Sequence, residues 1–513
     1  MTDERCQPPK WFPRLRRGRS RRLLCTCKAG LVSTADPPAP RHHVVVVGGG
    51  IAGLAAAHEL LVQRPDLAVT VLEGADQVGG KLRLGEVAGM PVDLGAESML
   101  ARRAEAVDHA SAVGLAADIV HPRVVNAGVW TRGAVHSLPP TLMGVPADLR
   151  VAARSGILGR AGVARARLEP RLPAVDLSAD TSIGSLVSRR LGREILDRLV
   201  EPLVGGVYAG RCSELSLFAA WPQVTAALKQ HPSLLRAAEV ETAAARPPEG
   251  QPRRPVFAGI AGGVGRLALA TADEIERLGG EVRRGAVVRE LMTHPAAGGW
   301  RLVVGSAAAP EVVDADAVVV AVPAAPTARL LARVAPAAAL EAARIESASL
   351  AIVTVAMNVA DVSADLRGSG FLVPPVDGTT IKASTYSSLK WDWFPDDLLV
   401  LRCSVGRHGD AAVLQRDDTE LLDAAMLDLR EATGLHAPLL DADVTRWGGA
   451  LPQYAVGHLD RVARIRTAVD AVPGLEICGA AYDGVGIPAV IATGRAAATR
   501  VVAALGPAAT MKA

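Results

Sequence analysis

The chain has 513 residues, which is enough for about three domains of ordinary size. Half of its residues are apolar and 21% are charged, a composition typical of folded enzymes that excludes disorder over most of the length. Residues 1–41 contain ten Lys and Arg against three Asp and Glu, whereas the remaining residues contain 46 and 50. Because the body of the chain is mildly acidic, we expect no nucleic-acid partner.

The first 41 residues have a distinct composition. Arginines crowd the stretch from Arg14 to Arg22, and prolines follow at Pro37, Pro38 and Pro40. The segment lacks the apolar stretch of a secretory signal, so we expect residues 1–41 to form a disordered basic extension. A tail that binds an anionic membrane or has a regulatory role is the alternative.

Six cysteines are present, three of them in the extension. The others, Cys212, Cys403 and Cys478, are far apart in sequence and the eleven histidines form no cluster, so no metal site is expected. A chain with this large a core does not depend on disulfides, which indicates a reducing compartment and a cytoplasmic location. No uninterrupted apolar run reaches the roughly 18 residues of a spanning helix, so we expect at most peripheral membrane contact.

A nucleotide-binding pattern begins just after the extension. The run Val44–Val47 is β-branched and apolar, as in a strand buried on both faces, and a helix-forming stretch starts near Ala55. Between them, Gly48, Gly50 and Gly53 have the spacing G-x-G-x-x-G. These glycines permit a tight turn, a close approach of a pyrophosphate and close helix packing. The residues expected to bind the dinucleotide here are Gly48, Gly49, Gly50, Ile51, Ala52 and Gly53.

A second strand, Val69–Leu72, leads into Glu73 and Gly74. An acidic residue at this distance accepts hydrogen bonds from an adenosine ribose. The turns that follow are similar to the second fingerprint of flavoprotein oxidases, whose FAD is extended, and they indicate FAD rather than NAD. Their expected cofactor-binding residues are Gly80, Lys81, Gly95, Ala96, Glu97 and Ser98.

A third segment near the end of the chain repeats the strand–loop–helix pattern. A strand is expected at Leu475–Gly479 and a helix at Ala489–Val502, with Val485, Gly486 and Ile487 in the loop between them. Backbone N–H groups of this loop can face a flavin ring and stabilise negative charge on it. The only nearby thiol, Cys478, falls inside the strand, so we expect the FAD to be non-covalent.

The middle of the chain gives coarser signals. Residues 139–240 have helical spacing, clearest at Ile183–Leu191 and Glu194–Leu203. Residues 281–322 alternate short strands with turns, and Ala315–Val322 is expected to be a buried strand of the nucleotide-binding sheet.

Together with further motifs, these segments resemble the oxygen-dependent porphyrinogen oxidases of haem synthesis, specifically the Gram-positive type that oxidises coproporphyrinogen III. The resemblance extends from about His43 to Leu505. The additional motifs are Glu201–Gly210, Gly368–Pro374, Ser387–Trp391, Leu451–Tyr454, Gly457–Leu459 and Tyr482–Pro488.

The resemblance implies an α/β fold in which a Rossmann-like FAD-binding domain is assembled from discontinuous segments, with a mixed-sheet substrate domain and a helical insertion. It also implies that Val288 meets the adenine and that Trp447 lies near the cofactor. The implied FAD-binding domain is 42–100, 256–325 and 470–507, the substrate-binding domain 101–138, 241–255 and 326–469, and the helical domain 139–240.

The implied substrate carries carboxylates, so cations should surround the mouth of its pocket. Arg102, Arg103 and Lys390 are expected to bind them, although each is also consistent with an ordinary surface charge. We name no catalytic acid or base, because a flavin accepts the hydride and the protein has to orient the substrate and exclude water. The implied reaction consumes O2 and releases H2O2, and the implied partner is a ferrochelatase that receives the porphyrin.

Other functions remain open at this point. A protoporphyrinogen IX oxidase catalyses the same class of reaction. A carotenoid desaturase or an amine oxidase shares the FAD fingerprint, but an amine oxidase needs aromatic walls, and the chain has only four Tyr and five Phe. A flavin-binding protein without turnover is the alternative outside enzymes.

Overall fold

A computed structural model describes residues 42–246, 255–294 and 298–507. The predicted basic extension, residues 1–41, lies outside the described residues, as do residues 247–254 of the predicted segment 241–255. The described residues from 42 onward belong to one compact unit. The division into three domains therefore stays a prediction.

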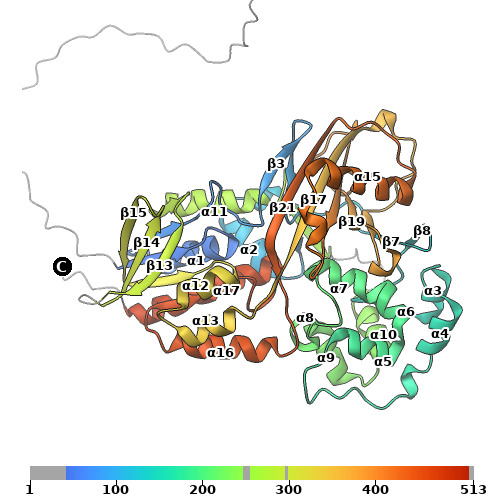
Figure 1. The fold of residues 1–513 in the computed structure, drawn as a ribbon, viewed down its shortest axis with the longest axis horizontal. Helices are drawn as coiled ribbons and strands as arrows, with labels where there is room; N and C mark the ends of the chain where they lie inside the picture. Colours follow the sequence, from blue (N-terminus) through green and yellow to red (C-terminus); the bar gives the residue numbers. More distant parts are fainter. Residues whose placement is uncertain (1–41, 247–254, 295–297, 508–513) are drawn as a thin grey trace, which may run out of the picture. The chain divides into compact units, whose positions relative to one another are not determined.

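A parallel sheet of five strands, in the order β12-β2-β1-β16-β22, forms the centre of the nucleotide-binding part. Its strands are β1 (His43–Val47), β2 (Ala68–Leu72), β12 (Glu281–Arg283), β16 (Ala317–Val320) and β22 (Leu475–Ile477). Three separate stretches of the chain thus meet in one sheet (Figure 1). The strands predicted from the valine-rich runs are confirmed.

Alternate residues of β1 enter two different cores, as expected for a strand covered on both faces. Val44 and Val46 pack with α1 (Ile51–Gln63), α11 (Gly265–Arg277) and α17 (Ile487–Leu505). Val45 and Val47 pack on the opposite face. The elements of that face are β13 (Val288–Thr293), β14 (Trp300–Gly305), β15 (Pro310–Ala315), α12 (Ala324–Leu331), α13 (Pro336–Ala342) and α16 (His458–Asp470).

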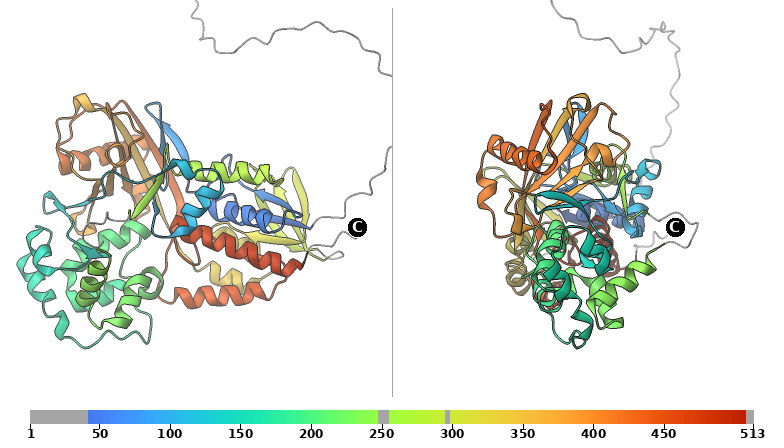
Figure 2. Two further views of the ribbon diagram at one scale, coloured as in Figure 1. Left: turned by 180° about the vertical axis from the view of Figure 1, so that it is seen from behind. Right: turned by 90° about the vertical axis from the view of Figure 1, so that its right-hand side faces the viewer.

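Helix α17 lies against α1, and the two stay side by side in both views of Figure 2. A Cβ on Gly494 would come within 2.2 Å of the Ala52 carbonyl oxygen, so only glycine allows this approach. By length and composition α17 is apolar enough to cross a membrane, although Arg495 and Arg500 interrupt its apolar sequence. Because 56% of this stretch is buried inside the protein, packing within the fold accounts for its apolar composition.

The second large sheet is mixed and has seven strands in the order β21-β17-β20-β19-β18-β7-β8. All neighbours are antiparallel except β18 and β7. The helix α15 (Asp418–Thr433) packs on this sheet. The strands are β7 (Gly128–Thr131), β8 (Ala134–Ser137), β17 (Ser347–Asn358), β18 (Gly370–Leu372), β19 (Ile381–Tyr386), β20 (Leu398–Val405) and β21 (Asp441–Pro452).

Helices dominate the stretch from residue 149 to 244, and they gather on one side of the molecule (Figure 1). Helix α5 coincides with the predicted Ile183–Leu191. The predicted helix Glu194–Leu203 is interrupted, because a π-helical segment at Leu196–Val200 precedes Pro202, which lacks the N–H that a regular helix would use. The helices are α3 (Leu149–Arg154), α4 (Arg160–Ala166), α5, α6 (Arg193–Ile195), α7 (Glu201–Tyr208), α8 (Leu217–Ala220), α9 (Pro222–Gln230) and α10 (Leu234–Ala244).

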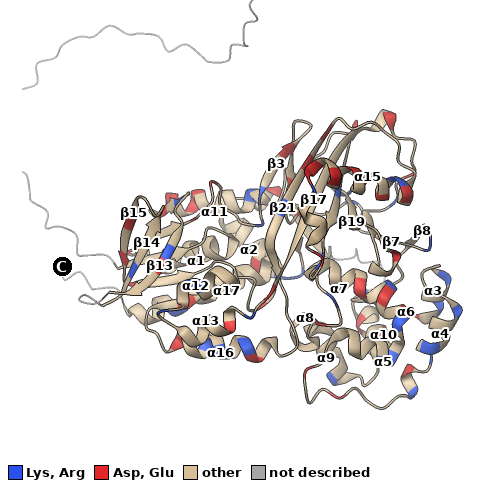
Figure 3. Cartoon of the chain, viewed as in Figure 1, with Lys and Arg blue, Asp and Glu red and all other residues tan. Residues whose placement is uncertain are grey.

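Short elements join these parts. They are β3 (Leu84–Val87), β4 (Met90–Asp93), β5 (Met99–Leu100), α2 (Ala104–Ala112), β6 (Ile119–Val120), β9 (Thr141–Leu142), β10 (Val145–Pro146), β11 (Phe257–Ile260) and α14 (Ser387–Lys390). Charges of both signs are interspersed over the described elements (Figure 3).

Candidate cofactor and substrate cavity

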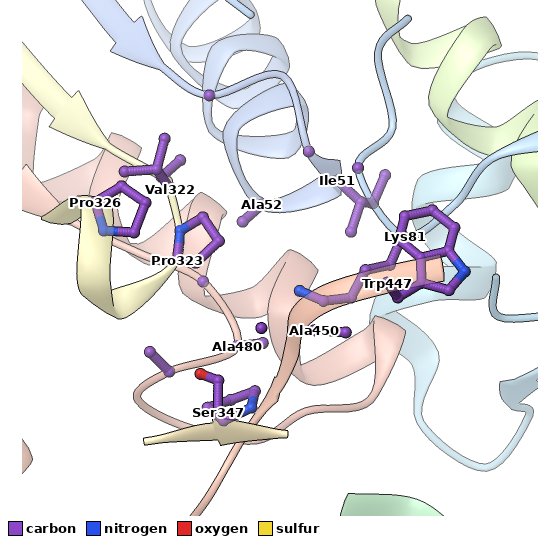
Figure 4. A pocket seen from close by; sticks show the side chains of 18 of the residues that line it. Ile51, Ala52, Lys81, Val322, Pro323, Pro326, Ser347, Trp447, Ala450 and Ala480 are labelled. Atoms are coloured by element: carbon purple, nitrogen blue, oxygen red, sulfur yellow. The ribbon is translucent and has the colours of Figure 1, made fainter. Parts of the chain in front are cut away.

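A cavity of about 960 Å³ lies where the carboxyl ends of the parallel strands meet the mixed sheet. Val47 and Leu72, at the ends of β1 and β2, line it from one side, and Ser347 and Ile352 on β17 line it from the other. Ligands of open α/β sheets bind at the carboxyl ends of the strands. In Figure 4, Lys81 and Trp447 border one side of this cavity, and Val322, Pro323 and Pro326 border the other.

The structure brings most of the predicted cofactor residues to this cavity. Five of them, Gly49, Gly53, Gly486, Glu97 and Ser98, are not among its lining residues. The predicted residues that line it are Gly48, Gly50, Ile51, Ala52, Glu73, Gly74, Gly80, Lys81, Gly95, Ala96, Val288, Trp447, Val485 and Ile487. Their roles in cofactor binding stay predictions.

The three glycines after β1 have different surroundings. Gly48 has a φ of +110°, which disfavours any other residue. A Cβ on Gly53 would be 2.0 Å from the Gly48 carbonyl oxygen, whereas a Cβ on Gly50 would meet nothing within 4 Å. Gly50 therefore faces open space, and that space is where a pyrophosphate could reach the backbone.

Two helices begin at the cavity without a capping side chain. Gly50 is the N-cap of α1 and Gly486 is the N-cap of α17, and neither can supply a side-chain acceptor. The first N–H groups of α1, and those of Ile487 and Ala489 in α17, are thus available to an anion, which the positive end of the helix dipole also favours. This arrangement fits the phosphates and the electron-accepting ring of a flavin dinucleotide.

Glu73 connects the end of β2 to the glycine-rich turn. Its Oε2 accepts a hydrogen bond from Gly49 N at 2.7 Å, and its Oε1 accepts one from Ala75 N at 2.8 Å. A carboxylate has about four lone-pair sites, so two acceptor sites remain for a ribose. The same side chain can thus hold the turn and bind the cofactor.

The charged side chains that line the cavity are mostly basic. Among the described lining residues, the bases are Lys81, Arg289, Arg329 and Lys382, and the single acid is Glu73. Burial lowers the pKa of Lys81, whose ammonium group has no counter-ion among the described residues. An anion in the cavity would compensate this excess of positive charge.

Trp447 and Glu97 join the turn at Leu94–Ser98 to the mixed sheet. Trp447 Nε1 donates to the Leu94 carbonyl oxygen at 2.9 Å. Glu97 is paired with Lys390 Nζ at 2.5 Å and with Arg402 Nη1 at 2.6 Å. Burial alone would raise the pKa of Glu97, but the two cations hold this pKa at about 2.

The predicted substrate cations have other surroundings. The side chain of Lys390 is only 12% exposed and forms an ion pair with Glu97. Arg103 is paired with Glu105, and Arg102 is exposed. None of the three lines the cavity, so their contact with a substrate stays a prediction.

The structure also identifies residues that sequence reasoning missed. Tyr454 Oη donates to the Ala480 carbonyl oxygen and accepts from Gly484 N, both at 2.7 Å, so it holds the loop before α17. His458 stacks on the Tyr454 ring with centroids 4.0 Å apart. Both residues belong to the motifs that carried the family resemblance, but only the fold shows what they contact. Lys382 gave no sequence signal.

No group of three or more His, Cys, Asp or Glu could hold a metal ion within residues 42–246, 255–294 and 298–507. Cys212, Cys403 and Cys478 are buried and free. Burial raises the pKa of Cys403 and of Cys478 to about 12.

Comparison with known proteins agrees with this geometry. A family model described as flavin containing amine oxidoreductase matches residues 51–502. The coproporphyrinogen III oxidase of Mycobacterium leprae is 37% identical over 455 residues, 88% of this chain and 96% of that protein. The protoporphyrinogen oxidase of Bos taurus is 29% identical, over 89% of this chain and 98% of that protein.

A solved structure supports the fold. A protein of Exiguobacterium sp. 255-15 assigned as a protoporphyrinogen oxidase superposes with a TM-score of 0.78 at 29% identity, covering 90% of this chain and 98% of that chain. The expected fold and the resemblance drawn from the motifs are confirmed, and the cofactor of the family is a flavin. The chain therefore belongs to the flavin containing amine oxidoreductase family, in the group of porphyrinogen oxidases named coproporphyrinogen III oxidase.

Proposed function

We propose that the chain oxidises coproporphyrinogen III to coproporphyrin III in haem synthesis, with non-covalent FAD in the cavity and O2 as the final electron acceptor. The observation that carries this proposal is the joint cavity, whose parallel-sheet side fits FAD and whose charged walls suit a polycarboxylate. The name of the Mycobacterium leprae relative supports the choice of substrate.

The residues present fit FAD. The uncapped N-terminus of α1 and the open space at Gly50 suit the pyrophosphate, Glu73 suits the ribose, and the N-terminus of α17 suits the flavin ring. Covalent flavins are attached through Cys, His or Tyr, and none of these residue types lines the cavity within the described residues. The lining therefore supports the proposal that the FAD is bound non-covalently.

FAD held by these residues would supply the acceptor for a hydride and would pass the two electrons on to O2, giving H2O2. Conversion of a porphyrinogen to a porphyrin removes six hydrogens in three such steps, so three O2 become three H2O2. The protein's own work is to orient the bridging methylene and to exclude water. Ile352, Leu350 and Trp447 give the cavity the apolar walls that this work requires.

An amine substrate suits these walls poorly. Amine oxidases surround the amine with aromatic rings, but Trp447 is the only aromatic residue among the described lining residues. The basic side chains of the cavity would also repel a protonated amine. The cavity therefore favours a porphyrinogen over the substrates of other members of the family.

The choice between porphyrinogens rests on charge. Coproporphyrinogen III carries four propionates, whereas protoporphyrinogen IX carries two and replaces the others by vinyl groups. We expect a higher kcat/KM for coproporphyrinogen III, measured side by side with the holoenzyme. If kcat/KM for protoporphyrinogen IX is equal or higher, the protein would be a protoporphyrinogen IX oxidase.

A second measurement follows the transfer of electrons from the porphyrinogen to the flavin. Under anaerobic conditions, added coproporphyrinogen III should bleach the absorbance of bound FAD within the time of turnover. Bound FAD that stays oxidised would indicate a flavin-binding protein without this activity.

We also propose a cytoplasmic location and hand-over of the porphyrin to a ferrochelatase. The free cysteines at positions 212, 403 and 478 suit a reducing compartment. Metal insertion is the step of haem synthesis that consumes a porphyrin.

Glu73→Ala should weaken FAD binding about 10- to 100-fold, because a hydrogen bond to a charged group contributes about 1.5–3 kcal/mol. The FAD that remains after dialysis, measured by absorbance, reports the change. Glu241→Ala, an exposed substitution on α10, is the control and should retain FAD fully. Full retention of FAD by Glu73→Ala would remove this residue from the site.

A further inference from the structure

Lys382 is a buried cation on the mixed-sheet side of the cavity. It lies on β19 and is 5% exposed, yet it is one of the residues that line the cavity. The pairing of β19 with β20 shifts register between Ile381 and Ala383, so Lys382 is the extra residue of a bulge. A bulge redirects a side chain, and bulges are frequent next to active sites.

The ammonium group of Lys382 is only partly satisfied. It donates one hydrogen bond, to the Gly406 carbonyl oxygen at 2.8 Å, although an ammonium group has three donors. No carboxylate within the described residues pairs with it. A buried cation without a counter-ion is costly, so its presence beside a cavity points to an anion that arrives from outside.

The neighbouring elements do not supply that anion. Arg407, just after β20, is the charged group that acts on Lys382, and it is a cation. Asp428 on α15 accepts hydrogen bonds from Thr380 N and Ile381 N, and Glu201 on α7 accepts from Cys212 N. Burial and, secondly, Arg407 lower the pKa of Lys382 to about 7.

The mixed-sheet wall of the cavity also carries neutral donors that suit a carboxylate. Ser404 on β20 faces Ala383 in the sheet, and Ser347 begins β17. Both line the cavity, and neither hydroxyl has a hydrogen-bond partner among the described residues. These groups belong to the mixed sheet, whereas the glycine-rich turn and Lys81 belong to the side that suits the FAD phosphates.

We propose that Lys382 binds a propionate carboxylate of the porphyrin substrate inside the cavity, which rests on the proposed function. The contact completes the hydrogen bonding of the ammonium group and supplies its missing counter-ion. It fixes the rotation of the macrocycle, because one propionate is held at a defined wall of the cavity.

Affinity should depend on pH. A carboxylate partner raises the pKa of the bound ammonium, so binding above about pH 7 takes up a proton. The affinity of the wild-type holoenzyme for coproporphyrin III should therefore fall as the pH rises above about 7. Its affinity for the tetramethyl ester, which has the same ring and no carboxylates, should stay constant.

The experiment measures binding of the product by fluorescence titration, apart from turnover. Lys382→Met should weaken coproporphyrin III binding about 10- to 100-fold at pH 6.5 and leave ester binding unchanged. Lys382→Arg should restore part of the loss without the pH dependence, since its charge is permanent. Lys229→Met, on the exposed face of α9, is the matched control.

Each outcome separates the hypotheses. Equal losses for coproporphyrin III and the ester, or an unchanged affinity for both, would overturn the role of Lys382. If Lys382→Met does not fold, the wild type alone still tests the proposal. A coproporphyrin III affinity of the wild type that does not change with pH would overturn the role of Lys382. If the wild type neither binds coproporphyrin III nor oxidises coproporphyrinogen III, the proposed function itself fails.

Discussion

Gly53→Ala should abolish FAD retention and lower the melting temperature, whereas Gly50→Ala should remove FAD and leave the stability of the cofactor-free chain unchanged. At position 53 the new Cβ would lie 2.0 Å from the Gly48 carbonyl oxygen and 3.1 Å from Val46 and Ala321 side-chain carbons. Since the nearest atom belongs to the backbone, the turn between β1 and α1 has to move. Overpacking of this kind costs about 1–3 kcal/mol or more.

Gly50→Ala should remove FAD for a different reason, because the residue at position 50 has room for a Cβ in the cofactor-free chain. Its backbone is extended, with φ of −69° and ψ of 167°, and a Cβ would meet no atom within 4 Å. The methyl group would occupy the space that the pyrophosphate needs, and the loss would appear only with the cofactor. Thermal melts of both apoproteins and FAD titrations distinguish the two effects. Normal FAD affinity in Gly50→Ala would place the pyrophosphate elsewhere.

The strands and turns of the parallel sheet were predictable because their signals are local. The valines from 44 to 47 are apolar on both faces of a strand, and the glycine spacing defines the turn that follows. The sheet order was not predictable in this way. The pairings of β1 with β16 and of β16 with β22 join segments far apart in sequence.

The charged residues were harder to predict for the same reason. Lys390 and Glu97 are 293 positions apart, and nothing near either residue indicates that they pair. The sequence predicted that Lys390 binds the substrate and that Glu97 binds the cofactor. In the fold the two side chains form an ion pair with each other. The orientation of the Lys382 side chain depends on a bulge in β19. A bulge shifts side chains to the opposite face of the sheet from the one that strand alternation predicts.

Glu97→Gln should destabilise the chain by about 3–5 kcal/mol, because it leaves two buried cations without their counter-ion. The side chains of Glu97, Lys390 and Arg402 are 11%, 12% and 7% exposed, so water replaces little of the lost interaction. Arg402 also donates to the Gly95 carbonyl oxygen at 2.5 Å, so the turn that lines the cavity should loosen with it. Chemical denaturation at pH 7 measures the loss, and Glu239→Gln, in an exposed pair with Arg236, should cost less than about 1 kcal/mol.

The dependence on pH separates the charge of Glu97 from its shape. The folded chain holds the pKa of Glu97 at about 2, below its ordinary value of 4.5, so the stabilisation is complete above about pH 4.5. This stabilisation is lost as the pH falls from about 4.5 toward about 2, because Glu97 takes up a proton in the unfolded chain at a higher pH than in the folded chain. The difference in stability between wild type and Glu97→Gln should therefore shrink on acidification. The stability difference could instead stay constant down to the lowest pH at which both chains fold. In that case the glutamine would destabilise the chain through poorer packing and not through the lost charge. The ion pairs of Glu97 would then contribute little to joining the two sheets.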